Sequence, residues 1–132
     1  MNIKTFIKGK AIEHIVEGKL ALQGYTIYPV MTESDCGDAI IEKEGKLEKI
    51  QIKMMRYKGS KNIKSLDLEV GGAHKYKYKN TNVDILIGYD MENDIVYMVP
   101  KRYFRKLNTC SVSETELKKR GYFLKENMEE IE

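Results

Sequence analysis

The spacing of apolar residues predicts a helix near the start of the chain. Apolar side chains recur at intervals typical of one helix face, at Ile12, Ile15, Val16, Leu20 and Ala21. Gly24 follows this stretch and fits the position directly after a helix. The sequence therefore predicts a helix over about residues 7–23, with one apolar stripe and one lysine-rich side.

Short apolar segments that follow predict strands. Residues 25–31 are rich in β-branched and aromatic side chains, and Pro29 favours an edge position because it has no N–H to donate. Residues 38–42 and 46–54 predict a hairpin with a turn at 43–45. Its second strand alternates, so Gln51 and Lys53 share a face while Ile50 and Ile52 share the other.

The second half of the chain predicts fewer regular elements. Residues 56–80 show no sustained periodicity and are interpreted as a long loop, with a short strand at 65–70 as an option. Residues 83–89 and 95–100 predict a second hairpin. A C-terminal helix over about residues 113–127 is predicted from Ser113 and Glu116, which fit a capping box.

The order helix, about four strands and helix places the chain in the α/β or α+β class with a mixed sheet. The length of 132 residues predicts one domain, residues 1–132.

Composition excludes several classes of protein. Hydrophobic residues make up 42% and charged residues 33%, which is typical of a folded chain. We expect no membrane association and a cytoplasmic, intracellular location, because the sequence lacks a long apolar run and a signal peptide. Cys36 and Cys110 have no metal-binding spacing, so we expect reduced thiols.

Charge is unevenly distributed. The net charge is only +3, but residues 53–79 carry eight basic and two acidic side chains, whereas the last nineteen residues carry four basic and six acidic ones. A positive face for a polyanion and a solvated charged loop are both consistent with this pattern.

Two basic segments have alternative interpretations. Lys75, Tyr76, Lys77, Tyr78 and Lys79 alternate cations and aromatic rings, which suits phosphate contact and base stacking or a strand with a packing face. The KRYFRK segment at 101–106 suits backbone contact or a solvated turn.

Glu13, Asp38, Gln51 and Lys53 form the candidate catalytic set. Adjacent antiparallel strands can bring Asp38 close to Gln51 and Lys53 on one face. Metal-assisted phosphodiester hydrolysis needs oxygen ligands and a cation. The candidate ligands are Asp38, the Gln51 amide oxygen, the Ile52 backbone carbonyl, and Glu13, directly or through water; Lys53 is the cation.

With these residues in this order, the chain resembles the PD-(D/E)XK nuclease superfamily, in particular a glutamine-variant branch that includes intron-encoded homing endonucleases. The resemblance rests on KGKAIE at 8–13, GYTIYPV at 24–30, Asp38, IQIK at 50–53, and NVDILIGYD with IVYMVP at 82–100. It covers about residues 8–104. Two departures are Gly37 in the place of the proline that names the motif, and Gln51 in the place of an acid.

The resemblance implies a restriction-endonuclease-like fold, an α/β fold with a mixed central sheet flanked by helices. It implies a Mg²⁺-dependent endodeoxyribonuclease, homing- or restriction-like, for which Mn²⁺ can substitute, acting on double-stranded or branched DNA near the nucleoid as a homodimer or higher homo-oligomer. The candidate DNA contacts are Lys8, Lys10, Arg56, Lys58, Lys61, Lys75, Tyr76, Lys77, Tyr78 and Lys79.

Alternatives remain open at this point. One is a Holliday junction resolvase of the same superfamily, and another is a non-cleaving DNA-binding module on a degenerate nuclease fold. Asp84 is either a supporting acid or a structural strand residue.

Overall fold

The computed structural model describes residues 5–30, 39–57, 62–70 and 76–125. Its first element is the long helix α1 (Thr5–Leu22), as predicted. Gly24 has φ 93° and lets the N–H of Tyr25 donate to the carbonyl of Leu20 at 3.1 Å, which closes the helix with a glycine cap. None of the described helices is long and apolar enough to cross a membrane.

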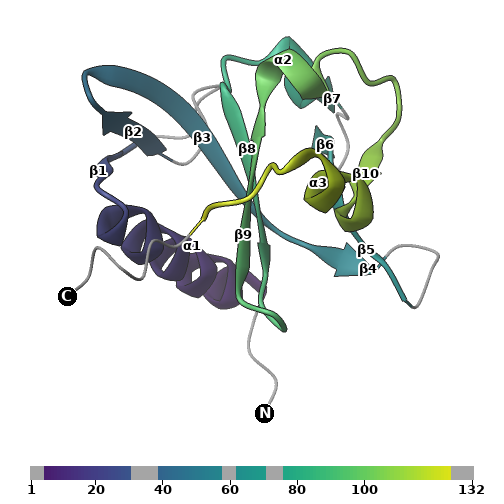
Figure 1. Ribbon diagram of the computed structural model, residues 1–132, viewed down its shortest axis with the longest axis horizontal. Coiled ribbons are helices and arrows are strands. Elements are labelled where there is room, and N and C mark those ends of the chain that lie inside the picture. The colour runs from purple at the N-terminus through teal and green to yellow at the C-terminus, as the bar shows by residue number, and fades with distance from the viewer. Residues whose placement is uncertain (1–4, 31–38, 58–61, 71–75, 126–132) are drawn as a thin grey trace.

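A mixed five-stranded sheet forms the centre of the molecule (Figure 1). In spatial order the strands are β1 (Thr26–Pro29), β2 (Ala39–Lys43), β3 (Lys46–Met54), β8 (Ile85–Asp90) and β9 (Ile95–Pro100). β3 and β8 are parallel, and the other neighbours are antiparallel. The predicted α/β class is confirmed, and β1 has the edge position that Pro29 favours.

Both predicted hairpins of this sheet are present. In the β2–β3 turn, Glu44 has φ 53° and Gly45 has φ 83°, the left-handed pair typical of a tight hairpin turn. β8 and β9 form the second hairpin and pair from Ile85↔Pro100 to Asp90↔Ile95.

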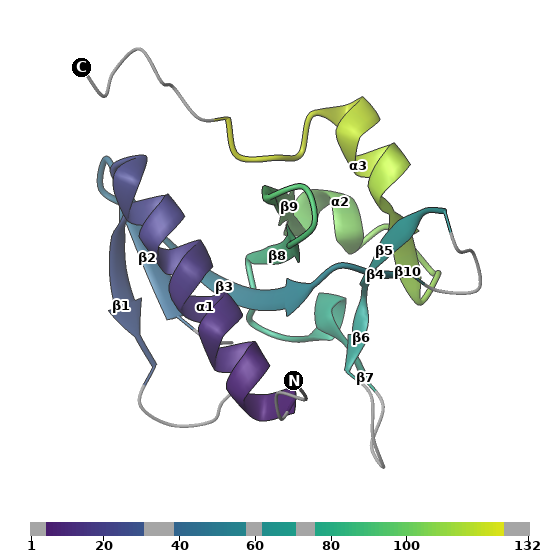
Figure 2. The ribbon, with the colours of Figure 1, turned by 90° about the horizontal axis from the view of Figure 1, so that it is seen from below.

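The sheet separates two hydrophobic cores. On one face α1 packs across the strands (Figure 2) and forms the first core with apolar side chains that include Ile50 and Ile52 of β3. On the other face Leu86 of β8 joins a second core with Leu66, Leu68, Tyr97 and Phe104, among others. The interior strand β8 is therefore buried on both faces.

Residues 56–80 differ from the prediction. In place of one long loop, the described part contains β4 (Arg56–Tyr57), β5 (Lys64–Asp67), β6 (Glu69–Val70), β7 (Tyr76–Lys77) and a 3-10 turn at Tyr78–Asn80. The optional strand at 65–70 is present but is divided between β5 and β6. Leu66 and Leu68 explain the difference, because they are 0% and 4% exposed and anchor the segment in the second core.

The partners of these strands come from distant sequence. β5 pairs with β4 and with β10 (Ser111–Ser113), and the N–H of Leu68 donates to the carbonyl of Cys110 at 2.9 Å. Periodicity within 56–80 alone gives no sign of a partner at 110–113, which is why the segment resembles a loop.

A buried ion pair ties β5 to β8. Lys64 Nζ lies 3.0 Å from Asp90 Oδ1, and the two side chains are 6% and 0% exposed. Burial alone would lower the pKa of Lys64, but the hydrogen bond with Asp90 and the negative charges of Asp90 and Glu92 together outweigh it and raise this pKa above its usual value. Burial likewise opposes ionisation of Asp90, but hydrogen bonds from Asn93 and Lys64 outweigh it and hold the pKa of Asp90 below its usual value.

The C-terminal elements are α2 (Lys101–Phe104) and α3 (Glu114–Arg120). Ser113 Oγ accepts the N–H of Glu116 at 3.2 Å, so the predicted N-cap is confirmed. The predicted helix end near residue 127 was wrong, because Gly121 with φ 75° ends α3 and the chain then runs beside β9, where Phe123 bridges Tyr97.

Candidate active site

Gln51 and Lys53 lie on one face of β3, as the alternation predicts. Both are half-buried, and in the parallel register they stand beside Leu86 and Gly88 of β8. Ile50 and Ile52 project to the opposite face, into the core beneath α1. The amide and the ammonium group are thus neighbours on the face that does not carry α1.

The end of β3 borders a cleft. The described pairing of β2 with β3 begins at Ala39↔Ile50, whereas β8 continues beside β3 as far as Met54. A cavity of about 310 Å³ opens near this end of β3, and we call it the β3 cleft. It is lined by Lys8, Gly9, Ile12, Ile52, Lys53, Met54, Arg56 and Asp67.

The β3 cleft carries more positive than negative charge. Lys8, Lys53 and Arg56 line it together with one carboxylate, Asp67. Arg56 Nη2 donates to Asp67 Oδ2 at 2.7 Å, which fixes an otherwise exposed guanidinium at the cleft wall. A surplus of cations in a concave site attracts phosphate groups.

The side chain of Lys53 is held by two contacts on the face of the sheet opposite α1. Its Nζ donates to the carbonyl of Glu69 at 3.5 Å and lies 5.2 Å from the ring centroid of Tyr78. A carbonyl and an aromatic face both attract an ammonium group and restrict its position.

Tyr78 and two nearby lysines are engaged within the protein. Tyr78 is 5% exposed, so in this structure its ring packs in the second core beside Lys53 and not against solvent. Lys77 Nζ donates to the carbonyl of Asn108 at 2.9 Å, and Lys79 Nζ donates to Asn108 Oδ1 at 3.1 Å. In this segment Tyr78 packs as the alternative interpretation has it, and the predicted DNA contacts of the segment stay a prediction.

Glu13 lies on α1 one residue beyond Ile12, a lining residue of the β3 cleft. Its carboxylate is 3.4 Å from Lys10 Nζ, and its side chain is 19% exposed. Glu13 itself is not among the residues that line the cleft.

Several candidate residues fall outside the part of the chain that the structure describes. Asp38, Lys58, Lys61 and Lys75 are outside the described residues, as is the side chain of Tyr76. Their predicted roles stay predictions.

The donor set is suited to a hard divalent cation. Among the described residues there is no group of three or more His, Cys, Asp or Glu side chains that could hold a metal ion. The candidate donors on β3 are instead an amide oxygen, from Gln51, and the Ile52 carbonyl, to which Asp38 would add a carboxylate. All are oxygens, the ligand type that Mg²⁺ and Ca²⁺ prefer.

Asp84 has the structural role that was one of its two interpretations. Its Oδ2 accepts the backbone N–H of Lys49 at 2.9 Å, which fixes the approach of the chain to β8.

Sequence reasoning did not single out Asp67, the acid of the β3 cleft. Only its alternating position in LDLEV at 66–70 hinted at a strand.

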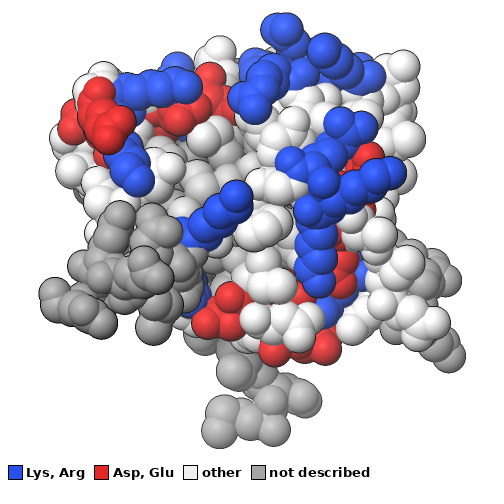
Figure 3. All heavy atoms as spheres, viewed as in Figure 1, with Lys and Arg blue, Asp and Glu red and all other residues white. Residues whose placement is uncertain are grey.

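The second basic cluster lies far from this cleft along the chain. Arg102, Arg105 and Lys106 are exposed on α2 and the turn after it, while Lys101 Nζ donates to the carbonyl of Thr81. Figure 3 shows lysine and arginine side chains gathered over α2 and α3.

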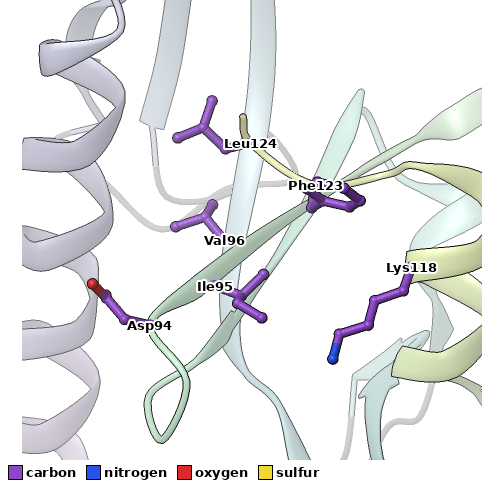
Figure 4. Close-up of a pocket in the computed structure, with 6 residues that line it drawn as sticks. All are labelled: Asp94, Ile95, Val96, Lys118, Phe123 and Leu124. Carbon is purple, nitrogen blue, oxygen red and sulfur yellow. The ribbon is translucent and has the colours of Figure 1, made fainter. Parts of the chain in front are cut away.

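An apolar hollow of about 380 Å³ lies elsewhere, beside β9 (Figure 4). It is lined by Asp94, Ile95, Val96, Lys118, Phe123 and Leu124. This mostly apolar lining offers one cation and no group of polar donors. We therefore locate the candidate active site in the β3 cleft, where polar groups converge.

Comparison with known proteins identifies the family of this chain. Residues 3–122 match the model of a family described as PD-(D/E)XK endonuclease. The chain belongs to the PD-(D/E)XK endonuclease family. This confirms the predicted superfamily and supports nuclease activity, and nucleases of this type generally use divalent metals.

Individual relatives of this PD-(D/E)XK chain cover much of its length. Over 81 residues the chain is 32% identical to Protein 5.3 of Escherichia phage T7. The aligned stretch spans 61% of this chain and 68% of the relative. The fold of this chain is similar to that of the bacterial homing endonuclease I-Ssp6803I, with a TM-score of 0.70, 17% identity, and coverage of 96% of this chain and 81% of the other. At that identity the similarity concerns the fold.

Proposed function

We propose that this protein is a divalent-metal-dependent DNA endonuclease with its active site in the β3 cleft. The observation that carries the proposal is the placement of Gln51 and Lys53 on one face of β3, with Lys53 lining a cationic cleft, in a chain of the PD-(D/E)XK family. The proposed catalytic residues are Asp38, Gln51 and Lys53, with Glu13 assisting.

Phosphodiester hydrolysis joins a water oxygen to phosphorus and breaks one P–O ester bond, and the departing oxygen takes up a proton. Negative charge grows on the phosphoryl oxygens as the new bond forms. The ammonium of Lys53 offsets this charge, and its contacts with Glu69 and Tyr78 position it before the substrate arrives.

We propose that Mg²⁺ is held by Asp38, the amide oxygen of Gln51 and the carbonyl of Ile52, with Glu13 as a further ligand directly or through water. The metal supplies Lewis-acid stabilisation of the phosphate and a more acidic bound water. Since Gln51 is neutral, Asp38 and Glu13 carry the negative charge of this ligand set. Mn²⁺ has similar ligand preferences and should substitute.

Substrate binding is proposed to use the cations around the cleft. Lys8 and Arg56 line it directly, and Lys10 lies on the same turn of α1. Arg56 is 58% exposed although it pairs with Asp67, so its guanidinium can contact solvent or a phosphate. A double-strand break takes one hydrolysis on each strand, and two copies of the site can act on the two strands together, which favours a homodimer or higher homo-oligomer.

The decisive experiment is cleavage of supercoiled plasmid, linear duplex and four-way-junction DNA in Mg²⁺, Mn²⁺ or EDTA. We expect cutting of duplex DNA that requires the metal. Lys53→Ala should lower the rate by about 100-fold or more, as is usual when a group that stabilises a transition-state charge is removed.

The matched control is Lys49→Ala, which removes a lysine from the same face of β3 away from the cleft. We expect its rate to stay within about threefold of the wild type, since a half-buried lysine away from the chemistry contributes little to it. Equal losses in both variants would contradict the role of Lys53. Metal-independent DNA binding without any cutting would replace the nuclease by a non-cleaving DNA-binding module, and cutting confined to the four-way junction would indicate a resolvase.

A further inference from the structure

A second positively charged groove lies between α2 and α3. It has a volume of about 320 Å³ and is lined by Arg102, Tyr103, Lys106, Leu107, Arg120 and Tyr122. We call it the α2–α3 groove. It shares no lining residue with the β3 cleft, and Figures 1 and 2 show α2 and α3 away from the amino end of α1, which borders that cleft.

The guanidinium of Arg120 is held in place before any ligand binds. It lies 4.7 Å from the ring centroid of Tyr103, and its Nε donates to Glu116 Oε1 at 2.8 Å. Tyr103 is in turn packed against Tyr122, with ring centroids 5.2 Å apart. Because Nε is used for Glu116, the two terminal amino groups keep their N–H donors for another acceptor.

Arg102 and Lys106 supply the other cations of the groove. They are four residues apart on the turn that begins with α2, where the N–H of Lys106 donates to the carbonyl of Tyr103 at 3.2 Å. Both side chains are exposed.

The lining therefore contains three cations and no carboxylate. Glu116 is the acid nearest to Arg120 and is bound to it outside the lining. Such a surplus of positive charge in a groove attracts anions from solution.

An extended chain of phosphates matches this arrangement better than a single small anion. The cations come from α2, the turn after it and the end of α3, and the rings of Tyr103 and Tyr122, packed on each other, also line the groove. Guanidinium groups bind phosphate oxygens through paired N–H donors, and tyrosine rings pack against sugars and bases.

We propose that the α2–α3 groove binds backbone phosphates of a nucleic acid at a site separate from the β3 cleft. The choice of a nucleic acid rests on the proposed function, whereas the anion site itself rests on the groove. Contact at this second surface adds to affinity without taking part in the chemistry.

The test is binding of a fluorescein-labelled DNA duplex, measured by anisotropy in EDTA over a range of salt concentrations. The variant is Arg102→Gln/Lys106→Gln, which keeps Arg120 and its partners. The control is Lys43→Gln/Lys46→Gln, which removes the same charge from two exposed lysines at the β2–β3 turn.

The groove variant should weaken binding about tenfold or more at ~0.1 M salt, and the slope of log affinity against log salt should fall in magnitude by about 2, one for each lost phosphate contact. The control should keep the wild-type slope. An unchanged slope in the groove variant would overturn the proposal, even if the DNA is still cut normally.

The slope difference is expected even if the wild type cuts no DNA or if Lys53→Ala cuts as fast as the wild type, so failure of the proposed function is distinguishable from failure of the groove. A thermal-shift series, in which the melting temperature is measured with increasing sodium phosphate, distinguishes binding of free phosphate from binding of backbone phosphates. Stabilisation of the wild type by sodium phosphate, with no slope difference for DNA, would show a site for free phosphate and contradict backbone binding.

Discussion

Removal of Lys64 should destabilise the fold strongly, because it leaves a charge buried without its main partner. The perturbation is Lys64→Met, which keeps the length of the aliphatic chain but removes the ammonium from beside Asp90. Asp90 is 0% exposed, and within the described part of the chain Lys64, at 3.0 Å, is the cation that forms an ion pair with it. The hydrogen bonds from Asn93 remain but carry no charge.

The expected cost follows from this burial. At 3.0 Å two unit charges attract by about 5 kcal/mol when the effective dielectric constant is ~20. Part of that attraction is offset by the desolvation of both groups, and breaking one side of a buried pair generally costs about 3–5 kcal/mol. We therefore expect Lys64→Met to lower the free energy of unfolding by about 3–5 kcal/mol.

The pH dependence provides a second readout. Because the pKa of Asp90 is lowered in the folded state, its contribution is present above its unfolded pKa of about 4 and is lost as the pH falls through the folded value. Because the pKa of Lys64 is raised, its contribution is present below its unfolded pKa of about 10.4 and is lost as the pH rises through the folded value. The difference between wild type and variant should thus be largest between about pH 5 and pH 9.

The assay is urea denaturation followed by circular dichroism at pH 7 and at pH 3.5. Lys46→Met is the matched control, since Lys46 is 75% exposed and its ion pair with Glu48 spans 3.7 Å. That control should change stability by less than about 0.5 kcal/mol. A Lys64→Met variant within ~0.5 kcal/mol of the wild type at pH 7 would refute the reasoning that the buried pair is strongly coupled.

Three further changes test other parts of the structure. Gly88→Ala should lower the free energy of unfolding by about 1–3 kcal/mol in urea titrations, because the new Cβ would lie 2.5 Å from the sulfur of Met55; a neutral effect would show that Met55 moves away freely. Ser113→Ala should cost about 1 kcal/mol by the same titration, through loss of the cap on Glu116, and a loss below ~0.2 kcal/mol would contradict that cap. Gln51→Glu should tighten Mn²⁺ binding in calorimetry at least about tenfold by adding a negative ligand; unchanged affinity would exclude Gln51 from the metal site.

The sequence predicts the elements of the central sheet well because their signals are local. Each signal lies within the segment that it shapes: the buried residues Ile12, Val16 and Leu20 in α1, Gly24 after it, and the turn at Glu44 and Gly45. Two other residues of the predicted apolar stripe, Ile15 and Ala21, are exposed. The alternation of β3 likewise predicts that Gln51 and Lys53 share a face. In these segments local preference and tertiary structure agree.

The short strands beside the second core, such as β4, β5 and β10, are less predictable because they depend on partners that are distant in the sequence. β5 is short, and in the sequence its neighbour β10 is separated from it by β6, β7, β8, β9 and α2. A lysine at position 64 reads as an exposed residue, yet it is buried because Asp90 arrives from another strand. Gly121 ends α3 early for a similar reason, since the residues after it pair with β9.

This dependence extends to the candidate active site. The motif places Gln51 and Lys53 on one strand, but the contacts that orient Lys53 come from Glu69 and Tyr78, in the segment that resembles a loop. α1 contributes the opposite wall of the β3 cleft through Lys8 and Gly9. The cleft is therefore assembled only when α1 and the segment that contains Glu69 and Tyr78 have packed against the sheet. The motif predicts which residues are candidates, whereas packing on both faces of the sheet determines where the lysine charge lies.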